Sequence, residues 1–118
     1  KLRVSGAFHS PLVAKAADRL RPAVDRVHIG EGVAEFMSTV TARVEDAQRY
    51  RELLIDQLTA PVRFTQAARE LIAGGVTTFV EVGPGNVLGG LLKRIDRSVR
   101  TFSVNDLKSL DDVTNALG

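Results

Sequence analysis

The amino-acid sequence predicts an α/β fold with a mainly parallel sheet. Its composition, with 44% apolar and 25% charged residues, is that of a globular protein. The segment 77–82 (TTFVEV) is rich in β-branched and aromatic residues and is the strongest strand prediction. Along the chain, predicted strands alternate with segments of helical periodicity, which is typical of parallel strands joined by crossover helices. With 118 residues, the chain has the length of one domain.

The first third of the chain predicts a strand, a helix and a second strand. Residues 2–5 alternate as a short strand that stops at a glycine. Ser10 followed by Pro11 is a typical helix start, and apolar residues then repeat at helical spacing over 11–27. The residues expected on the buried face of this helix are Leu12, Ala16, Leu20 and Val24. A second strand is expected around residues 36–40.

Two helices are expected in the middle of the chain. Asp46 is a candidate cap for a helix that ends at Pro61. The apolar stripe of this helix consists of Tyr50, Leu53, Leu54 and Leu58. A helix from about Thr65 to Ala73 should end at the following pair of glycines, the usual position of a left-handed cap. The last third predicts a helix over 87–95, a strand over 100–104 and a helix over 110–117.

Charge and composition exclude several classes of protein. Sixteen Lys and Arg against fourteen Asp and Glu leave a net charge of +2, which does not indicate a nucleic-acid binder. Cysteine is absent, which removes disulfides, thiolate catalysis and Cys-ligated zinc and is compatible with a reducing cytoplasm. No apolar run approaches the roughly 20 residues of a membrane span, and no signal-peptide pattern is present. We therefore expect a cytoplasmic protein with no membrane partner.

His9 is the first candidate functional residue. It is expected just beyond the carboxyl end of the strand at 2–5, the edge at which open α/β sheets bind ligands. A general base is one interpretation, and a structural or solvated histidine is the other. No serine lies in a G-x-S-x-G elbow, so a nucleophile activated by His9 would lie outside this chain. His28 has no partner at ligand spacing, so we predict an exposed side chain there and no metal site.

The glycine-rich segment 83–86 (GPGN) has two interpretations. Backbone N–H groups at the start of the helix over 87–95 can bind an anion. The spacing, however, matches neither G-x-G-x-x-G nor the phosphate-loop pattern. The alternative, which we favour, is a tight turn that packs strand and helix closely, with Gly89 and Gly90 admitting a neighbouring backbone.

Basic side chains gather around the end of the same helix, at Lys93, Arg94, Arg97 and Arg100. They form either a solvated face that complements the helix dipole or a landing site for an acidic or phosphate-bearing partner. Nucleic acid is the less favoured partner, because no aromatic residue is interleaved with these charges.

Three segments match the motifs of one known family in the right order. They are 4–12 (VSGAFHSPL), 57–64 (QLTAPVRF) and 81–88 (EVGPGNVL), the last followed by 93–95 (KRI). Together they closely resemble the histidine, Gln-Leu/Pro-Val-Arg and Glu-Val-Gly-Pro-Gly motifs of malonyl-CoA:acyl carrier protein transacylases, the bacterial fatty-acid synthesis acyltransferases. The resemblance covers essentially the whole chain. It implies the C-terminal part of an α/β-hydrolase-like acyltransferase large subdomain.

The resemblance also implies a reaction. In this family an active-site serine takes malonyl from malonyl-CoA and passes it to the phosphopantetheine thiol of acyl carrier protein, without a cofactor. His9 is implied to be the general base, and the backbone carbonyl of Gln57 to accept the imidazole Nδ1–H, as an aspartate does in a catalytic triad. Phe8 is implied to fill the acyl pocket and exclude methylmalonyl groups. Candidates for contact with the carrier or coenzyme A are Lys93, Arg94 and Arg97.

Several parts of the family pattern have no counterpart in this sequence. The serine elbow, the malonyl-binding arginine and the ferredoxin-like subdomain precede the histidine segment, and Thr39 stands where many relatives carry asparagine. The chain also starts with Lys1 rather than Met. We therefore expect 1–118 to be the C-terminal segment of the acyltransferase domain, inactive without an upstream serine-bearing polypeptide. The alternatives are a non-catalytic module that binds acyl carrier protein, and a longer protein of which only this part is in view.

Overall fold

The computed structural model describes residues 6–30 and 32–118, and the chain divides into two compact units. The first unit is Lys1–Ala67 and the second is Ala68–Gly118. The strand expected at residues 2–5 lies outside the described residues. Because the two units are compact by themselves, each is described separately.

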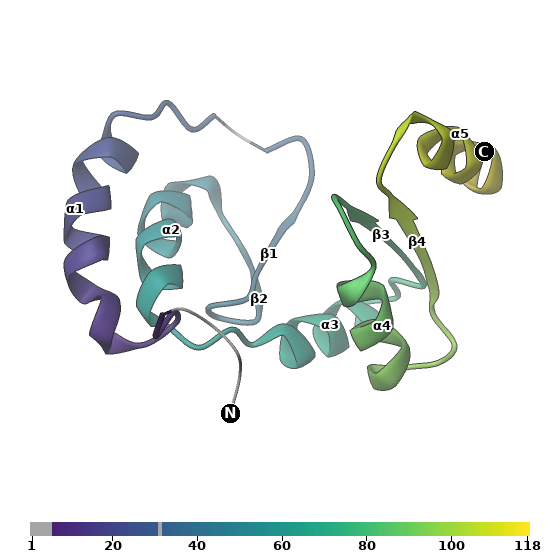
Figure 1. Ribbon diagram of the computed structural model, residues 1–118, viewed down its shortest axis with the longest axis horizontal. Helices are drawn as coiled ribbons and strands as arrows, with labels where there is room; N and C mark the ends of the chain where they lie inside the picture. The colour runs from purple at the N-terminus through teal and green to yellow at the C-terminus, as the bar shows by residue number, and fades with distance from the viewer. Residues whose placement is uncertain (1–5, 31) are drawn as a thin grey trace. The chain divides into compact units, whose positions relative to one another are not determined.

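Two packed helices form the body of the first unit (Figure 1). The Ser10 hydroxyl accepts a hydrogen bond from the Leu12 N–H at 3.3 Å, which confirms the predicted cap. A 3₁₀ turn, η1 (Pro11–Val13), continues as α1 (Ala14–Asp25). A second 3₁₀ turn, η2 (Ala47–Arg49), leads into α2 (Tyr50–Thr59). The core between the helices consists of Ala17, Val24 and Ile55, with Leu58 packed against it.

The buried face of α1 differs from the prediction. Of the four expected residues only Val24 is buried, whereas Leu12 is 83% exposed and Leu20 is 39% exposed. Ala17, which lies two turns before Val24, is buried instead. Because α2 packs over Ala17 and Val24, the other three residues of the predicted stripe remain exposed. The stripe of α2 is likewise only partly correct, since Leu53 is buried but Leu54 is 52% exposed.

An ion pair links the two helices of the first unit. The Arg21 guanidinium donates to both Glu52 carboxylate oxygens, at 3.0 and 3.1 Å. This hydrogen-bonded contact holds the pKa of Glu52 below its usual value. Asp46 precedes η2 as expected, but its side chain makes no capping hydrogen bond, so that part of the prediction is wrong.

A short antiparallel hairpin completes the first unit. β1 (Phe36–Ser38) pairs with β2 (Arg43–Glu45), a strand that the sequence analysis does not predict. The chain reverses within four residues: the Ser38 hydroxyl accepts from the Val40 N–H at 3.1 Å, and the Ala42 N–H donates to the Ser38 carbonyl at 2.8 Å. Ser38 is only 2% exposed, so the turn is anchored on a buried side chain.

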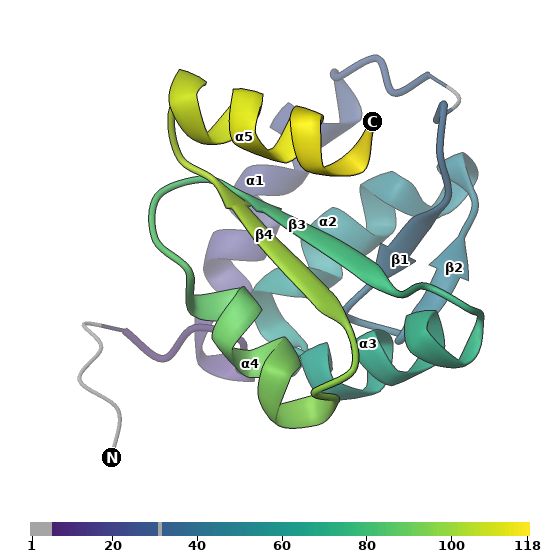
Figure 2. The same ribbon diagram turned by 90° about the vertical axis from the view of Figure 1, so that its right-hand side faces the viewer.

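Parallel strands form the centre of the second unit (Figure 2). β3 (Thr78–Val82) and β4 (Arg100–Val104) pair in register from Thr78 opposite Arg100 to Val82 opposite Val104. α4 (Val87–Ile95) connects the strands and packs against both, and α5 (Leu107–Leu117) packs against β4. The predicted strand–helix–strand order, the parallel pairing and the α/β class are confirmed.

The helix that precedes β3 ends as predicted. α3 (Phe64–Ala73) is followed by Gly75 with φ +96°. The Gly75 N–H donates to the Ile72 carbonyl and the Val76 N–H to the Leu71 carbonyl, both at 3.0 Å. This pair of bonds defines a Schellman cap, in which glycine supplies the left-handed residue.

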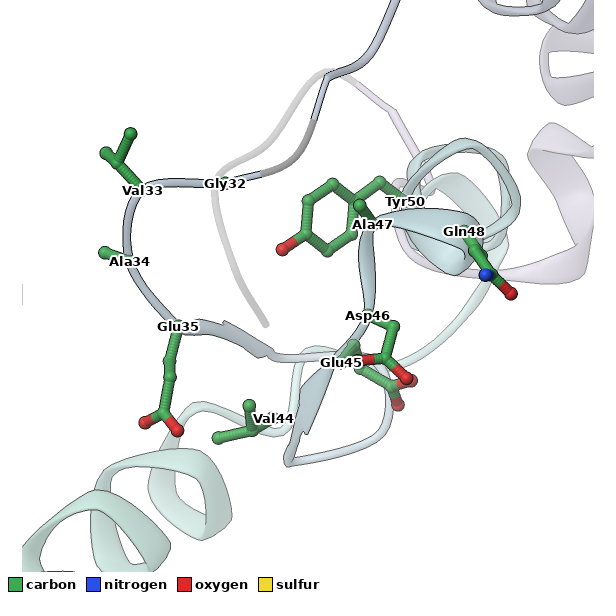
Figure 3. A pocket seen from close by; sticks show the side chains of 10 residues that line it. All are labelled: Gly32, Val33, Ala34, Glu35, Val44, Glu45, Asp46, Ala47, Gln48 and Tyr50. Carbon is green, nitrogen blue, oxygen red and sulfur yellow. The ribbon is translucent and has the colours of Figure 1, made fainter.

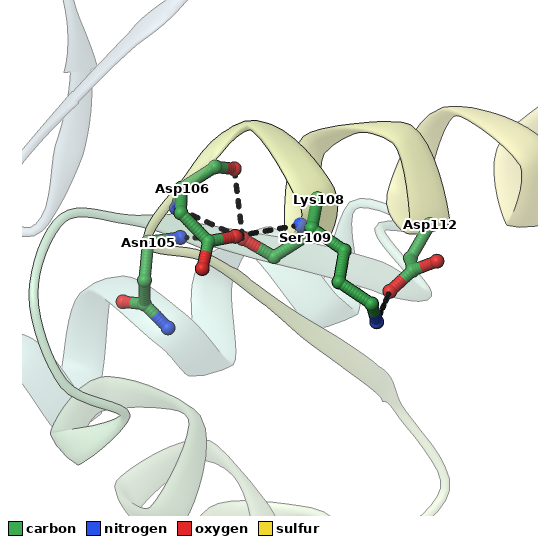
Figure 4. Close-up of polar contacts among 5 residues, drawn as sticks. All are labelled: Asn105, Asp106, Lys108, Ser109 and Asp112. Carbon is green, nitrogen blue, oxygen red and sulfur yellow. Dashed lines mark hydrogen bonds and ion pairs between the residues drawn. The ribbon is translucent and has the colours of Figure 1, made fainter.

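α5 begins three residues earlier than expected, because Asp106 caps it (Figure 4). The Asp106 carboxylate accepts from the Ser109 N–H at 2.7 Å, and the Ser109 hydroxyl accepts from the N–H groups of Asn105 and Asp106 at 2.9 and 3.0 Å. The bonds from the Ser109 backbone and side chain lower the pKa of Asp106. In the described part of the chain, no helix has both the length and the apolar character needed to cross a membrane.

Candidate active site

His9 lies at the C-terminal end of α2, where it binds two backbone carbonyls. Its N–H donates to the Leu58 carbonyl at 3.0 Å, and its ring Nδ1 lies 2.8 Å from the Gln57 carbonyl oxygen. The last four carbonyls of a helix have no partner within the helix, and His9 satisfies two of them. Because a carbonyl oxygen can only accept a hydrogen bond, the ring contact requires the proton on Nδ1.

The backbone of His9 is bent to make both contacts. Its φ of 57° lies in the left-handed region, which costs a residue other than glycine about 1–2 kcal/mol. The Ser10 hydroxyl donates to the Ala7 carbonyl at 2.7 Å and closes the turn around His9. His9 is exposed, and with Nδ1 engaged its Nε2 atom has no hydrogen-bond partner among residues 6–30 and 32–118. This is the arrangement of a ring that can take up a proton at Nε2.

The turn of the β1–β2 hairpin holds Gln57 from its other side. The Thr39 hydroxyl donates to the Gln57 Oε1 atom at 2.9 Å, and the Gln57 Nε2 atom lies 3.4 Å from His9 Nδ1. The Thr39 carbonyl accepts from the Arg63 N–H at 2.8 Å. Three segments distant in sequence therefore meet at Gln57, and Thr39, which the sequence analysis noted only as a departure from the asparagine of the family, makes a polar contact in the site.

Phe8 precedes His9, and its side chain is 62% exposed. Its ring atoms lie close to the backbone of Gly6, within 3.1–3.6 Å of the position that a Cβ atom would occupy there. The structure thus brings His9 and Gln57 into contact, and Phe8 directly precedes His9 in the chain. The other predicted histidine, His28, is exposed, as expected.

An apolar cavity and a larger one lie among the described residues of the first unit, and neither is lined by His9 or Phe8. An apolar cavity of about 240 Å³ reaches Gln57 and is lined mainly by side chains such as Phe36, Leu53 and Leu54. A larger one, of about 710 Å³, lies between the segment 32–35 and the residues around β2 (Figure 3). The Glu45 carboxylate in this cavity is paired with the Arg49 guanidinium at 3.1 Å. Among the described residues, no group of three or more His, Cys, Asp or Glu side chains could hold a metal ion.

Glu81 decides between the two interpretations of the glycine-rich turn. Its two carboxylate oxygens accept from the Leu88 N–H at 3.1 Å and the Gly89 N–H at 2.9 Å, at the start of α4. Two of the N–H groups at the start of α4 are therefore already bonded to a side chain of the same unit. The tight-turn interpretation is supported, and Gly83 and Gly85 serve it with φ of 136° and 98°.

One detail of the tight-turn prediction is wrong. A Cβ atom at Gly89 would lie 3.6 Å from Glu81 Oε2 and 3.8 Å from the Thr101 side chain, and a Cβ at Gly90 would meet nothing within 4 Å. The close neighbours of Gly89 are thus side chains of β3 and β4 and not another backbone.

All four side chains of the basic cluster are exposed, and two of them are hydrogen-bonded to backbone carbonyls. The Lys93 ammonium donates to the Val99 carbonyl. The Arg100 guanidinium donates to the Ala116 carbonyl at 3.2 Å and lies over the Phe102 ring, 5.2 Å from its centroid. Arg94 and Arg97 are exposed on the surface of the second unit. These two arginines are therefore the better candidates for contact with an acidic partner.

Comparison with known proteins identifies relatives along nearly the whole chain. No family model matches, but a malonyl CoA-acyl carrier protein transacylase of Bacillus subtilis (strain 168) is 42% identical over 111 residues, which cover 93% of this chain and 35% of that protein. The crystal structure of the transacylase of the same name from Clostridium perfringens superposes with a TM-score of 0.89 at 35% identity, covering 99% of this chain and 37% of that one. A structure of a malonyl-transacylase in complex with a type II PKS acyl-carrier protein matches at 34% identity and a TM-score of 0.89, over 98% of this chain and 38% of the other.

These relatives are named as transacylases, a class of acyltransferase. The chain belongs to the malonyl CoA-acyl carrier protein transacylase family and corresponds to its C-terminal part. It spans little more than a third of the length of the relatives it matches. The alternative of a non-catalytic module is not favoured by this relationship.

Proposed function

We propose that this chain supplies the general base of an enzyme that transfers malonyl from malonyl-CoA to acyl carrier protein. The observation that carries the proposal is the contact of His9 Nδ1 with the Gln57 carbonyl at 2.8 Å, in a chain that belongs to the transacylase family. The contact keeps the proton on Nδ1, so Nε2 is the basic nitrogen. The nucleophilic serine lies outside the sequence of this chain.

In the first half of the reaction, His9 Nε2 takes the proton of the serine hydroxyl as its oxygen attacks the malonyl thioester carbonyl. The tetrahedral intermediate then breaks its C–S bond, and the imidazolium returns the proton to the departing coenzyme A thiolate. The products are a malonyl-serine ester and free coenzyme A. The Gln57 carbonyl orients the ring throughout, in the role that a carboxylate has in a Ser-His-Asp triad.

In the second half, the same nitrogen takes the proton of the carrier's phosphopantetheine thiol. The sulfur attacks the malonyl-serine ester, the C–O bond breaks, and the imidazolium protonates the serine oxygen. The enzyme is restored and malonyl is bound to the carrier. Because each step is an acyl or proton transfer, this reaction needs neither a metal nor a redox cofactor.

Phe8 and the exposed arginines have separate roles in this proposal. Phe8, next to the base in the chain, narrows the acyl site and excludes an α-methyl branch. Arg94 and Arg97, with Lys93 behind them, attract the carrier or coenzyme A, both of which are acidic. The cysteine-free sequence is compatible with an enzyme of the cytoplasm.

The serine elbow, the malonyl-binding arginine and the ferredoxin-like subdomain of the family belong to an upstream polypeptide in this proposal, and the chain alone is inactive. The first measurement is the intact mass of the protein purified from its natural source, compared with the 12.8 kDa of this chain. The second is malonyl transfer to holo acyl carrier protein, followed by mass spectrometry of the carrier. Transfer by the natural protein, or by this chain mixed with the serine-bearing part, supports the proposal. Carrier binding without transfer in both cases contradicts it.

A further inference from the structure

Gln57 contacts the His9 ring through two groups of opposite hydrogen-bonding character. Its backbone carbonyl, 2.8 Å from Nδ1, can only accept and therefore requires a proton on Nδ1. Its side-chain Nε2, 3.4 Å from the same atom, can only donate and therefore favours an Nδ1 without a proton. The two contacts favour opposite tautomers of the imidazole. Only the tautomer with the proton on Nδ1 leaves the His9 Nε2 atom free to accept a proton from the serine.

Thr39 determines which contact prevails. Its hydroxyl donates to Gln57 Oε1 at 2.9 Å, and this bond fixes one end of the side-chain amide. The other end, Nε2, is then kept at 3.4 Å from the ring, beyond the 2.7–3.2 Å range of good hydrogen bonds. The backbone carbonyl, at the shorter distance, keeps the Nδ1 proton.

Thr39 is held in place by its own backbone contact and by its buried neighbour. Its carbonyl accepts from the Arg63 N–H at 2.8 Å. Thr39 therefore binds both Gln57, within α2, and Arg63, in the segment that follows α2. The neighbouring Ser38 is buried and closes the hairpin turn through its bond to Val40. A change at Thr39 therefore reaches the ring through Gln57, since Thr39 itself has no bond to His9.

We propose that Thr39 is a positioning residue that acts through the Gln57 side chain to hold His9 in the Nδ1–H tautomer. This inference rests on the proposed function of His9 as general base. It assigns a role to the position at which this chain departs from the asparagine of many relatives. Loss of the hydroxyl frees the amide, whose N–H groups can then approach Nδ1 and stabilise the other tautomer.

The test measures the tautomer directly in the complete transacylase labelled with ¹⁵N. Long-range ¹H–¹⁵N correlation spectra, recorded where the rings are neutral, report the proton on each ring nitrogen, and exposed His28 is the internal reference. Thr39→Val keeps the shape of the side chain without its hydroxyl, and Thr39→Ser keeps the hydroxyl. We expect the ratio of Nδ1–H to Nε2–H at His9 to fall about fivefold in Thr39→Val and to stay near the original value in Thr39→Ser.

A second background tests the route through the amide. Gln57→Ala retains the backbone carbonyl and removes the side chain, so Thr39→Val should have no further effect on the His9 tautomer there. The proposal is overturned if Thr39→Val leaves the ratio unchanged, or lowers it equally in both backgrounds. If Thr39→Val does not fold, Gln57→Ala alone decides, because removing the competing amide should keep or raise the Nδ1–H fraction and a fall would contradict the proposal. The readout needs neither coenzyme nor carrier, so its failure is distinct from a failure of malonyl transfer.

Discussion

Two helix ends in this chain are closed by side chains from other segments, with opposite chemical consequences. In the first unit, His9 binds the last carbonyls of α2 with its backbone N–H and its ring Nδ1. In the second unit, Glu81 binds the first N–H groups of α4 with both carboxylate oxygens. The imidazole uses one of its two nitrogens to hydrogen-bond the helix, whereas the carboxylate uses both of its oxygens.

The difference shows why a polar group at a helix end does not by itself mark a functional site. Both caps satisfy backbone groups that a helix leaves without partners. Only the histidine retains a second polar atom, Nε2, that can react after the structural bond is made. The comparison therefore supports the proposed role of His9 in the first unit and a structural role for the glycine-rich turn of the second.

The strongest test of this comparison is His9→Asn in the complete transacylase. Asparagine tolerates the left-handed backbone and carries an N–H donor close to the position of Nδ1, but it has no equivalent of Nε2. We expect malonyl transfer to fall by about a thousandfold, the typical contribution of a general base, with little change in melting temperature. The measurement is the steady-state rate of carrier loading. Near-normal transfer would show that Nε2 is not the base.

Glu81→Ala should lower stability and leave the chemistry of His9 unchanged, the reverse of the result expected for His9→Asn. It leaves the Leu88 and Gly89 N–H groups without their acceptor, and we expect a loss of about 1–2 kcal/mol in the free energy of unfolding, typical of a lost N-terminal cap. The control, Glu81→Gln, keeps one acceptor oxygen and should cost less. Urea unfolding followed by circular dichroism measures both variants. An unchanged stability, or a change in the ring ¹⁵N shifts of His9, would break the assignment of a structural role.

These two caps also show where sequence analysis was sufficient and where it was not. The alternation of strands and helices, the parallel pairing and the Gly75 cap follow from local patterns, and all were predicted. The pairing of His9 with Gln57 joins residues 48 apart, which no periodicity reveals, and it entered only through the resemblance to a family. Glu81 was placed in a strand, but a cap from a residue six positions before the first residue of the helix has no local signature.

The missed elements have similar physical reasons. β2 consists of Arg43, Val44 and Glu45, too short a run to show strand composition, and it forms because the turn before it is anchored on buried Ser38. The start of α5 was placed late because the cap pairs Asp106 with a serine at the third helical position, where the usual box has Glu or Gln.

A change at Phe8 tests whether selectivity for malonyl over methylmalonyl groups is determined in the first unit, next to the general base. We expect Phe8→Ser in the complete enzyme to raise methylmalonyl transfer relative to malonyl transfer by about tenfold, because the smaller side chain removes the clash with an α-methyl group. The measurement is competition between the two coenzyme A esters, with the loaded carrier analysed by mass spectrometry. Phe8→Leu, which retains most of the bulk, should change the ratio less. An unchanged ratio in Phe8→Ser would remove Phe8 from the acyl site.

The exposed arginines test whether the second unit contributes recognition of the carrier. Arg94→Glu and Arg97→Glu should each raise the KM for acyl carrier protein several-fold at low salt and leave kcat nearly unchanged. Lys93→Gln should have a smaller effect, because its ammonium is already bound to the Val99 carbonyl. The difference should shrink as salt screens the charges. Equal effects of all three changes, or none, would contradict the distinction between the hydrogen-bonded Lys93 and the two arginines.

The smallest expected effect concerns Asp106, whose carboxylate caps α5 in the second unit. The hydrogen bonds from the Ser109 backbone and side chain lower the pKa of its carboxyl, so the folded state binds the proton less readily than the unfolded chain does. The stabilisation is complete above the unfolded aspartate pKa of about 3.9 and is lost as the pH falls through the lower folded value. Asp106→Asn keeps a capping oxygen but cannot titrate. We expect the melting temperature of the original chain to exceed that of the variant near neutral pH and to lose this advantage on acidification, whereas a difference independent of pH would show that the carboxylate charge does not stabilise α5.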